Sequence, residues 1–184
     1  MSKVGLNCRP LVSVRGMRST LFVVSVMIAG CVALGLASVL KPLPVLVWNA
    51  SASVPVGLYA VSSGTLPRVR DLVLVRLPED ARRLASDRRY LPSDTPAIKH
   101  VVAAGGDFVC MINGAIYING RHRAGALHRD SRDRILKPWQ GCLRLPADQI
   151  FLLNDAPASF DGRYFGPTPR TDVIGILTPL WTFP

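Results

Sequence analysis

The sequence has few of the residues from which proteins build metal sites. Among its 184 residues are four cysteines and three histidines, with no C-x-x-C pair and no cluster of cysteine with histidine. Structural zinc sites are recognised by such closely spaced ligands. His122 and His128 stand in an arginine-rich stretch, where solvated loop residues are the simpler interpretation. We therefore predict no metal site.

Lysine is scarce, although the chain is basic with a formal net charge of +10. Only Lys41, Lys99 and Lys137 follow residue 40, whereas arginine is frequent. A bias of this kind is common in GC-rich genomes and favours a bacterial source. The arginines are scattered and have no aromatic residues between them on which bases could stack. We expect attraction to anionic membrane lipid and no binding of nucleic acid.

Charge is entirely missing from residues 20–40, T-L-F-V-V-S-V-M-I-A-G-C-V-A-L-G-L-A-S-V-L. A bilayer core about 30 Å thick needs roughly 20 such residues in a helix. The apolar core of a cleaved signal peptide is only about 7–15 residues long. The run therefore predicts an uncleaved transmembrane anchor, with a cleaved signal or a buried core helix as the alternatives.

Positive charge before this run predicts the orientation of the anchor. Lys3, Arg9, Arg15 and Arg18 precede it with no acidic residue among them. Lys and Arg flanking a membrane helix stay on the cytoplasmic side. We predict a cytoplasmic basic tail (1–19), a transmembrane anchor (20–40) and an exported domain (41–184). In a bacterium this is a single-pass inner-membrane protein with a periplasmic domain; in a eukaryote the domain lies in a lumen.

The exported part has the pattern of a mainly β domain. Short runs rich in Val, Ile, Leu, Phe and Tyr are separated by Gly, Pro and Asn-Gly pairs, which is typical of strands and turns. The expected strands are residues 56–62, 71–77, 98–104, 107–112, 115–120, 141–146, 149–154 and 173–181. Asn113-Gly114 predicts a two-residue hairpin turn. Residues 78–91 suggest one surface helix, and residues 122–139 a long polar loop.

Two cysteines, Cys110 and Cys142, fall in the predicted exported domain. Disulfides form and persist outside the cytoplasm. Because these are the only exported pair, we predict a disulfide between them; two buried, reduced thiols are the alternative.

Serine and lysine residues in the domain suggest nucleophilic chemistry. Ser51 and Ser53 lie just after the anchor, and a serine hydroxyl needs a base to become a good nucleophile. Lys99 stands among apolar strand residues, where burial could neutralise its amine. His100 is a competing base, but neighbouring strand residues face opposite sides. Asp161 and Arg163 could form an ion pair near Ser159, either in a catalytic role or simply within a turn.

Four segments together resemble the type I signal peptidase family. They are S-A-S-V-P-V-G-L-Y (51–59), Arg70-Asp71 before an apolar strand, I-K-H-V-V-A-A-G-G-D (98–107) and S-F-D-G-R-Y-F-G-P (159–167). The first and last are most similar to the TraF-type peptidases of conjugative transfer systems. The resemblance covers residues 49–175 and implies a signal-peptidase-like antiparallel β domain on a single transmembrane helix.

The resemblance implies a role for each matching residue. Ser53 matches the nucleophile and Lys99 the general base, which favours Lys99 over His100. Ser159 matches the serine that orients the lysine, and Asp161 with Arg163 the supporting ion pair. Ser51 matches the position of an oxyanion-hole hydroxyl. Ordinary signal peptidases have two residues between the serine and the proline, whereas this sequence has only Val54, so Ser51 remains an alternative nucleophile.

The function implied is a serine endopeptidase that matures conjugative pilin or other exported precursors and needs no cofactor. Its partners would be the precursor protein, membrane lipid and components of a conjugation apparatus. Two alternatives remain open. One is a general signal peptidase for secreted preproteins, although the span from Lys99 to Ser159 is short for that enzyme. The other is a noncatalytic bitopic component of a secretion apparatus, against which the intact serine, lysine and aspartate set argues.

Overall fold

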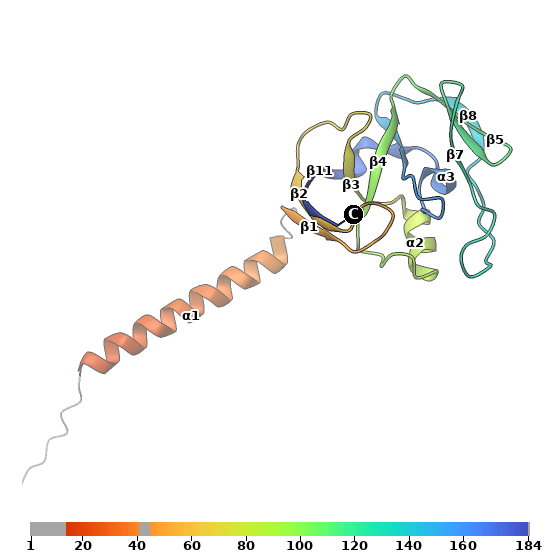
Figure 1. Ribbon diagram of the computed structural model, residues 1–184. Coiled ribbons are helices and arrows are strands. Elements are labelled where there is room, and N and C mark those ends of the chain that lie inside the picture. The colour runs from red at the N-terminus through yellow and green to blue at the C-terminus, as the bar shows by residue number, and fades with distance from the viewer. Residues whose placement is uncertain (1–13, 41–44, 184) are drawn as a thin grey trace, which may run out of the picture. The chain divides into compact units, whose positions relative to one another are not determined.

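A computed structural model of the chain describes residues 14–40 and 45–183 (Figure 1). The chain divides into two compact units, Met1–Pro42 and Leu43–Pro184. Lys3 and Arg9 of the predicted tail, and Lys41 after the anchor, lie outside the described residues.

The first unit contains one long helix, α1 (Val14–Leu40). It begins six residues before the predicted anchor and ends at the same residue. The segment Ser19–Leu36 is long and apolar enough to cross a membrane. Its large apolar side chains, such as Leu21 and Phe22, are exposed. In length and composition, α1 fits a single-pass membrane anchor.

The second unit is a mainly β domain built from two antiparallel sheets. The larger sheet has the strand order β1-β2-β11-β3-β4-β9-β10, and the smaller has the order β7-β6-β5-β8. The strands of the larger sheet are β1 (Leu46–Asn49), β2 (Gly57–Ser62), β3 (Leu72–Val75), β4 (Ala97–Ala104), β9 (Gln149–Leu153), β10 (Thr168–Pro169) and β11 (Val173–Thr182). Those of the smaller sheet are β5 (Phe108–Ile112), β6 (Ala115–Ile118), β7 (Arg121–Gly125) and β8 (Gly141–Arg144). The predicted fold class, an antiparallel β domain with one N-terminal apolar helix, is confirmed.

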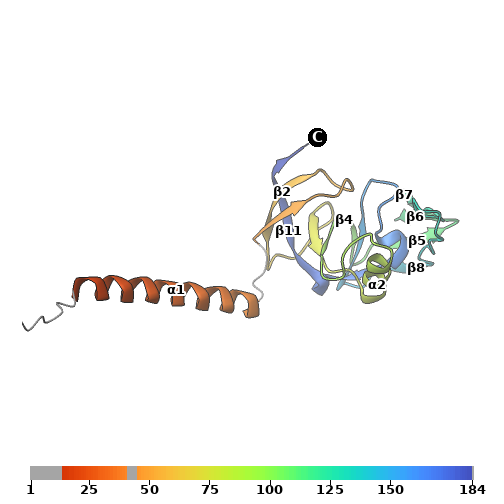
Figure 2. The ribbon, with the colours of Figure 1, turned by 90° about the horizontal axis from the view of Figure 1, so that it is seen from below.

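Two short helices and a 3-10 turn complete the domain: α2 (Glu79–Asp87), α3 (Gly162–Phe165) and η1 (Arg170–Asp172). Ala81 and Ala85 on α2 are buried against the larger sheet, together with apolar residues of β3, β4 and β9. A second apolar cluster joins β4 and β9 to the smaller sheet and includes Phe151 and Ile116. Figures 1 and 2 show the smaller sheet at one end of the domain and β1 and β2 at the other, with β3 and β4 between them.

All the runs that the sequence predicted as strands form strands, usually one to three residues shorter. At the predicted hairpin, Asn113 and Gly114 have φ angles of 50° and 78°. Positive φ at both positions is what a type I′ turn requires. The predicted helix is also present, but it is limited to α2.

The prediction of a long loop at residues 122–139 is wrong in part. Its first residues form β7, which pairs with β6 at the edge of the smaller sheet. Further along, Arg129 and Ile135 form an isolated β-bridge. The Asp130 carboxylate accepts a hydrogen bond from the Tyr90 hydroxyl and another from Arg134 Nε. Hydrogen bonds and ion pairs therefore order a segment that has few apolar residues to bury.

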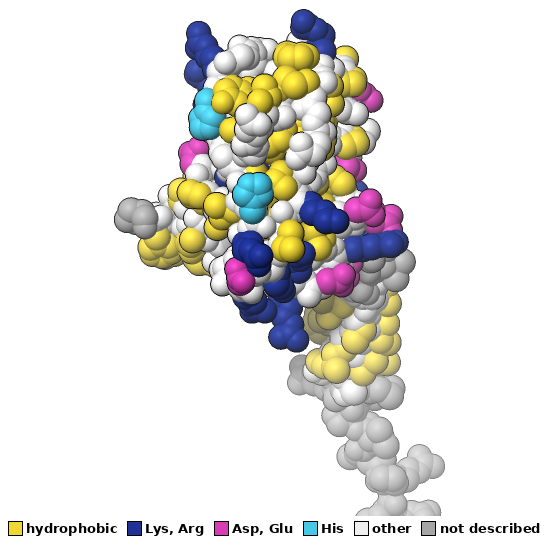
Figure 3. Space-filling model, turned by 90° about the vertical axis from the view of Figure 1, so that its right-hand side faces the viewer, with side chains coloured by type: hydrophobic (Ala, Val, Ile, Leu, Met, Phe, Trp, Pro, Cys, Tyr) yellow, Lys and Arg dark blue, Asp and Glu magenta, His cyan; other side chains and the backbone are white. Residues whose placement is uncertain are grey.

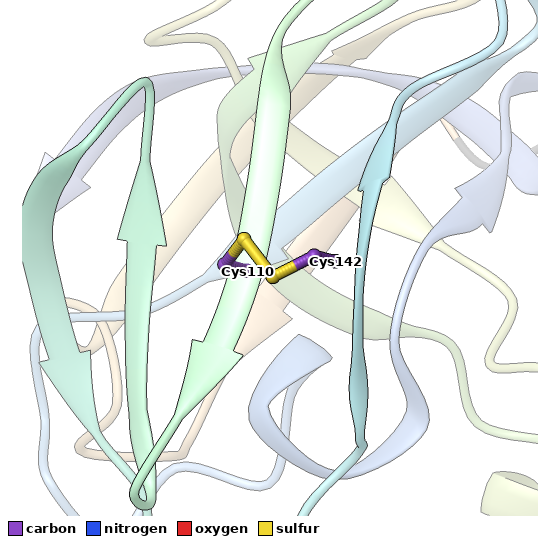
Figure 4. The surroundings of a disulfide bond; sticks show 2 residues. All are labelled: Cys110 and Cys142. Atoms are coloured by element: carbon purple, nitrogen blue, oxygen red, sulfur yellow. A yellow bond between two sulfur atoms is a disulfide. The ribbon is translucent and has the colours of Figure 1, made fainter.

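The predicted disulfide between Cys110 and Cys142 is present (Figure 4). The two cysteines are opposite one another on the neighbouring strands β5 and β8. The bond therefore crosslinks two strands of the smaller sheet that are 32 residues apart in the sequence.

Positive charges on the domain are interspersed with negative ones. Arg83, Arg129 and Arg134 each form an ion pair with an aspartate or glutamate four residues away. The face seen in Figure 3 likewise has Lys and Arg side chains beside Asp and Glu. Part of the arginine charge on the folded domain is therefore paired locally with carboxylates.

Candidate active site

Lys99 is a buried lysine in the middle of strand β4. Burial alternates along this strand, so that Ala97, Lys99, Val101 and Ala103 are buried and the residues between them are half-buried. Lys99 is 6% exposed and lies opposite Val73 of β3. The alternation places the amine on the same face of the sheet as the apolar cluster under α2.

The Lys99 amine has one hydrogen-bond partner among the described residues: Nζ donates to Ser159 Oγ over 2.9 Å. Burial lowers the pKa of Lys99 from 10.5 to about 8, although the nearby Asp161 carboxylate opposes the shift. An amine with this pKa is neutral in a substantial fraction of molecules near pH 8. Such a lysine can accept a proton, which an ordinary exposed lysine rarely does.

Ser159 belongs to a buried segment that continues into α3. The segment contains the predicted ion pair: Arg163 Nη2 lies 2.7 Å from Asp161 Oδ2, and Arg163 Nε lies 2.8 Å from Asp161 Oδ1. Burial by itself lowers the pKa of Arg163, but the Asp161 carboxylate outweighs it and raises the pKa above its ordinary value. A Cβ on Gly162 would lie 2.7 Å from the Leu152 carbonyl oxygen, so only glycine lets the segment approach β9 this closely.

Arg163 also holds the surrounding backbone. Its guanidinium donates hydrogen bonds to the carbonyl oxygens of Gly125, Asn154, Ala156 and Pro157. The residue is 1% exposed, so its guanidinium is shielded from water. The ion pair thus fixes the segment that carries Ser159 and connects it with the end of β7.

Asn154 connects this segment with the lysine strand. Its Oδ1 accepts from the His100 backbone N–H, and its Nδ2 donates to the Ile98 carbonyl. Its own backbone N–H donates to Asp161 Oδ2 over 3.0 Å. Asn154 therefore bonds to β4 on both sides of Lys99 and at the same time to the ion pair.

Ser51 and Ser53 lie in the loop between β1 and β2. Ser51 is exposed and Ser53 is half-buried. Their hydroxyl oxygens are 2.8 Å apart and hydrogen-bonded to each other. The structure thus brings the two predicted serines together.

The predicted site residues form three bonded pairs: Lys99 with Ser159, Asp161 with Arg163, and Ser51 with Ser53. Within residues 14–40 and 45–183, no hydrogen bond joins Ser53 to Lys99. His100 lies on the opposite face of β4 from Lys99, where it is half-buried.

Two polar residues of the site were not singled out from the sequence: Asn49 and Asn154, which are 6% and 2% exposed. Each is an asparagine at the end of an apolar strand segment, and that position is the only signal the sequence offers. Groups of three or more His, Cys, Asp or Glu residues placed to bind a metal do not occur in the described part of the chain.

Comparison with known families decides the class of protein. The family described as signal peptidase, peptidase S26, matches residues 18–181. The chain belongs to this family. The match includes all three bonded pairs of the site and most of the apolar helix. Membership of the S26 family supports a function of the signal peptidase type.

Relatives in this family include proteins of conjugal transfer. The chain is 33% identical to the probable conjugal transfer protein TraF of Sinorhizobium fredii over 146 residues, which cover 73% of this chain and 76% of that protein. It is 34% identical to the conjugal transfer protein TraF of Agrobacterium fabrum over 145 residues, which cover 73% of this chain and 81% of that protein. It is 30% identical to the plasmid transfer protein TraF of Escherichia coli over 145 residues, which cover 73% of this chain and 82% of that protein.

Among solved structures, a signal peptidase I from Enterococcus faecalis V583 is similar to this chain. The alignment covers 64% of this chain and 100% of the peptidase chain in that structure. The sequence identity is 22% and the TM-score 0.39.

Proposed function

We propose that this S26 family protein is a membrane-anchored serine endopeptidase in which Ser53 is the nucleophile and Lys99 the general base. The observation that carries the proposal is the buried Lys99 amine, whose pKa is lowered to about 8 and which hydrogen-bonds to Ser159. A base is most effective when its pKa is near the working pH. A serine–lysine pair needs neither histidine nor metal.

In the first half of the reaction, neutral Lys99 accepts the proton of the Ser53 hydroxyl as Ser53 Oγ attacks the scissile carbonyl carbon. For this step the hydroxyl exchanges its hydrogen bond with Ser51 for one with Lys99. The tetrahedral intermediate collapses when the Lys99 ammonium gives its proton to the leaving amine nitrogen. The product is an ester between Ser53 and the part of the precursor on the amino side of the cut.

In the second half, Lys99 takes a proton from water or from an amine, which attacks the ester carbonyl. Water gives a free carboxylate, whereas an amine gives a new peptide bond. In both cases Lys99 returns the proton to Ser53 Oγ. At the end of the cycle, Ser53 is again a hydroxyl and Lys99 is again neutral.

The other site residues support this chemistry by position. Ser159 orients the lysine amine, and the Asp161–Arg163 pair holds the segment that carries Ser159. The Ser51 hydroxyl and the Ser53 backbone N–H would donate to the developing oxyanion, where each donor is commonly worth a factor of about 10²–10³. Because the Ser51 hydroxyl bonds to Ser53 in this structure, it must turn to reach the oxyanion.

The substrate we propose is a precursor protein of a conjugation apparatus, such as a pilin, processed at the outer surface of the bacterial inner membrane. The relatives named as conjugal transfer proteins support this substrate class. The apolar helix α1 would keep the domain at the membrane, with its N-terminus in the cytoplasm and the domain in the periplasm.

The test is co-expression of the full chain with a candidate pilin precursor, followed by mass measurement of the product. Ser53→Ala and Lys99→Arg should abolish processing, because the first removes the nucleophile and the second keeps a permanent charge. His100→Ala is the matched control and should process normally. Processing by Ser53→Ala but not by Ser51→Ala would mean that Ser51 is the nucleophile. Normal processing by both would favour a noncatalytic component of the apparatus.

A further inference from the structure

A buried asparagine holds the loop that carries the two serines. Asn49 is the last residue of β1 and lies opposite Gly57, the first residue of β2. The loop between the strands is therefore residues 50–56. Asn49 is 6% exposed, and its side chain turns towards the backbone of this loop.

The Asn49 amide is fully used in bonds to the loop. Nδ2 donates to the carbonyl oxygens of Ser51, Pro55 and Val54 at 2.8, 3.0 and 3.1 Å. Oδ1 accepts from the Ser51 backbone N–H at 3.0 Å. An amide has two donor hydrogens, so three carbonyls share them. These partners lie before and after Ser53 in the sequence, so the loop backbone is held on both sides of it.

Such bonds matter because a loop residue has no strand partner to hold it. Fixing the backbone of one residue costs roughly 1–2 kcal/mol in conformational entropy. One buried side chain offsets part of this cost for several residues at once. The Tyr59 hydroxyl also donates to the Pro55 carbonyl, over 2.6 Å, and supports the far end of the same loop.

We propose that Asn49 is a positioning residue for the nucleophile. By holding residues 51–55, it keeps Ser53 Oγ where it can reach both Lys99 and the scissile carbonyl carbon. The inference rests on the proposed serine–lysine mechanism. A displacement of about 1 Å at a reacting atom can cost on the order of a hundredfold in rate, so loss of Asn49 should slow the chemical step.

Two substitutions at Asn49 distinguish the effect of losing the hydrogen-bond donors from the effect of losing side-chain volume. Asn49→Ala removes all four bonds and leaves a small cavity. Asn49→Asp keeps the shape and the acceptor for the Ser51 N–H but replaces the donors to the three carbonyls. Tyr59→Phe is the matched control, since it removes one bond to the same loop and leaves Asn49 in place.

The readouts are kcat, KM and their pH dependence on a peptide spanning the pilin cleavage site, together with backbone amide exchange. Both Asn49 variants should lower kcat by about tenfold to a hundredfold, with KM within about twofold of the wild type. The pH profile of Asn49→Ala should not move, because this substitution adds no charge near Lys99. Amide exchange should quicken in residues 50–56 only, and Tyr59→Phe should keep kcat within about threefold.

The proposal is overturned if either Asn49 variant keeps wild-type kcat, or if KM rises while kcat stays constant. It is also overturned if exchange quickens throughout the domain, because Asn49 would then stabilise the fold as a whole. Failure of the proposed function is a separate result, seen as no cleavage by the wild type. In that case, unchanged exchange of residues 50–56 in Asn49→Asp would reject the role of Asn49 in holding the loop as well.

Discussion

Lys99 shows how one residue acquires chemistry from its position in a strand. The sequence indicated a lysine between apolar neighbours, and strand alternation then allowed either a buried or a solvent-facing amine. The structure places it on the buried face with Ser159. What the sequence could not indicate is the pair of asparagines, Asn49 and Asn154. The partners of their side chains are backbone groups, which leave no pattern of residue types.

The pH dependence of activity should follow the Lys99 amine. Because the base must be neutral, kcat/KM should rise about tenfold per pH unit below the pKa of about 8 and level off above it. Steady-state rates between pH 5.5 and about 9.5 on the full chain in detergent would measure this. Lys137→Ala, which changes an exposed lysine, should leave the profile unchanged. A profile that is flat from pH 6 to about 9 would rule out Lys99 as the base.

Burial of this lysine should also reduce stability in a defined pH range. Up to pH 8 the amine is charged in both the folded and the unfolded chain, and the cost of burial is present in full. Between pH 8 and 10.5 the folded amine is neutral while the unfolded one is still protonated, so stability rises with pH. Lys99→Met should therefore be more stable than wild type at pH 7. The gain in free energy of unfolding should be at most about 3 kcal/mol, reduced by the contribution of the lost hydrogen bond to Ser159.

The measurement is chemical denaturation of both proteins at several pH values. The difference between them should shrink as the pH rises from 8 to 10.5. A difference that is constant with pH would show that the lysine pKa is not lowered in the folded chain.

At the scale of elements, alternating apolar residues and Asn-Gly turns were enough to predict most strands. β7 was missed because its residues are mainly polar and exposed, and only pairing with β6 makes it a strand. α3 was missed because it has only four residues. The predicted ion pair Asp161–Arg163 is present, but its many bonds to backbone carbonyls could not be predicted, because they depend on how β7 and the loop after β9 meet.

Arg163→Lys should destabilise the domain by about 3 kcal/mol, roughly 10 °C in Tm. A lysine keeps the charge but cannot reproduce the planar bonds to Asp161 and to the carbonyls. Arg129→Lys is the control: Arg129 also pairs with an aspartate, Asp133, but both side chains are more than half exposed, and such pairs contribute little. Thermal unfolding of the two variants compares them directly. Equal Tm values would mean that the buried network does not stabilise the domain.

At the scale of the whole molecule, the chain contains an apolar helix and a folded β domain, and it belongs to the S26 family. The length and lack of charge of residues 20–40 were sufficient to predict the helix. Orientation rests on the four positive charges that precede this run, two of which, Lys3 and Arg9, lie outside the described residues.

An N-in orientation predicts that a reporter fused after Pro184 is active only if it is of a periplasmic type. Paired fusions, one to alkaline phosphatase and one to a cytoplasmic reporter, would measure this in a bacterial host. An active cytoplasmic reporter at that position would reverse the predicted topology and place the domain on the wrong side for exported precursors.

The central claim is that Ser53 becomes acylated with Lys99 as its base. The most direct test is the intact mass of the full chain, quenched in acid while it turns over the precursor, followed by peptide mapping. We expect an added mass equal to the part of the precursor on the amino side of the cut, located on the peptide that contains Ser53 and missing in Lys99→Arg. An adduct on Ser51, or processing with no adduct in any quenched sample, would contradict the account.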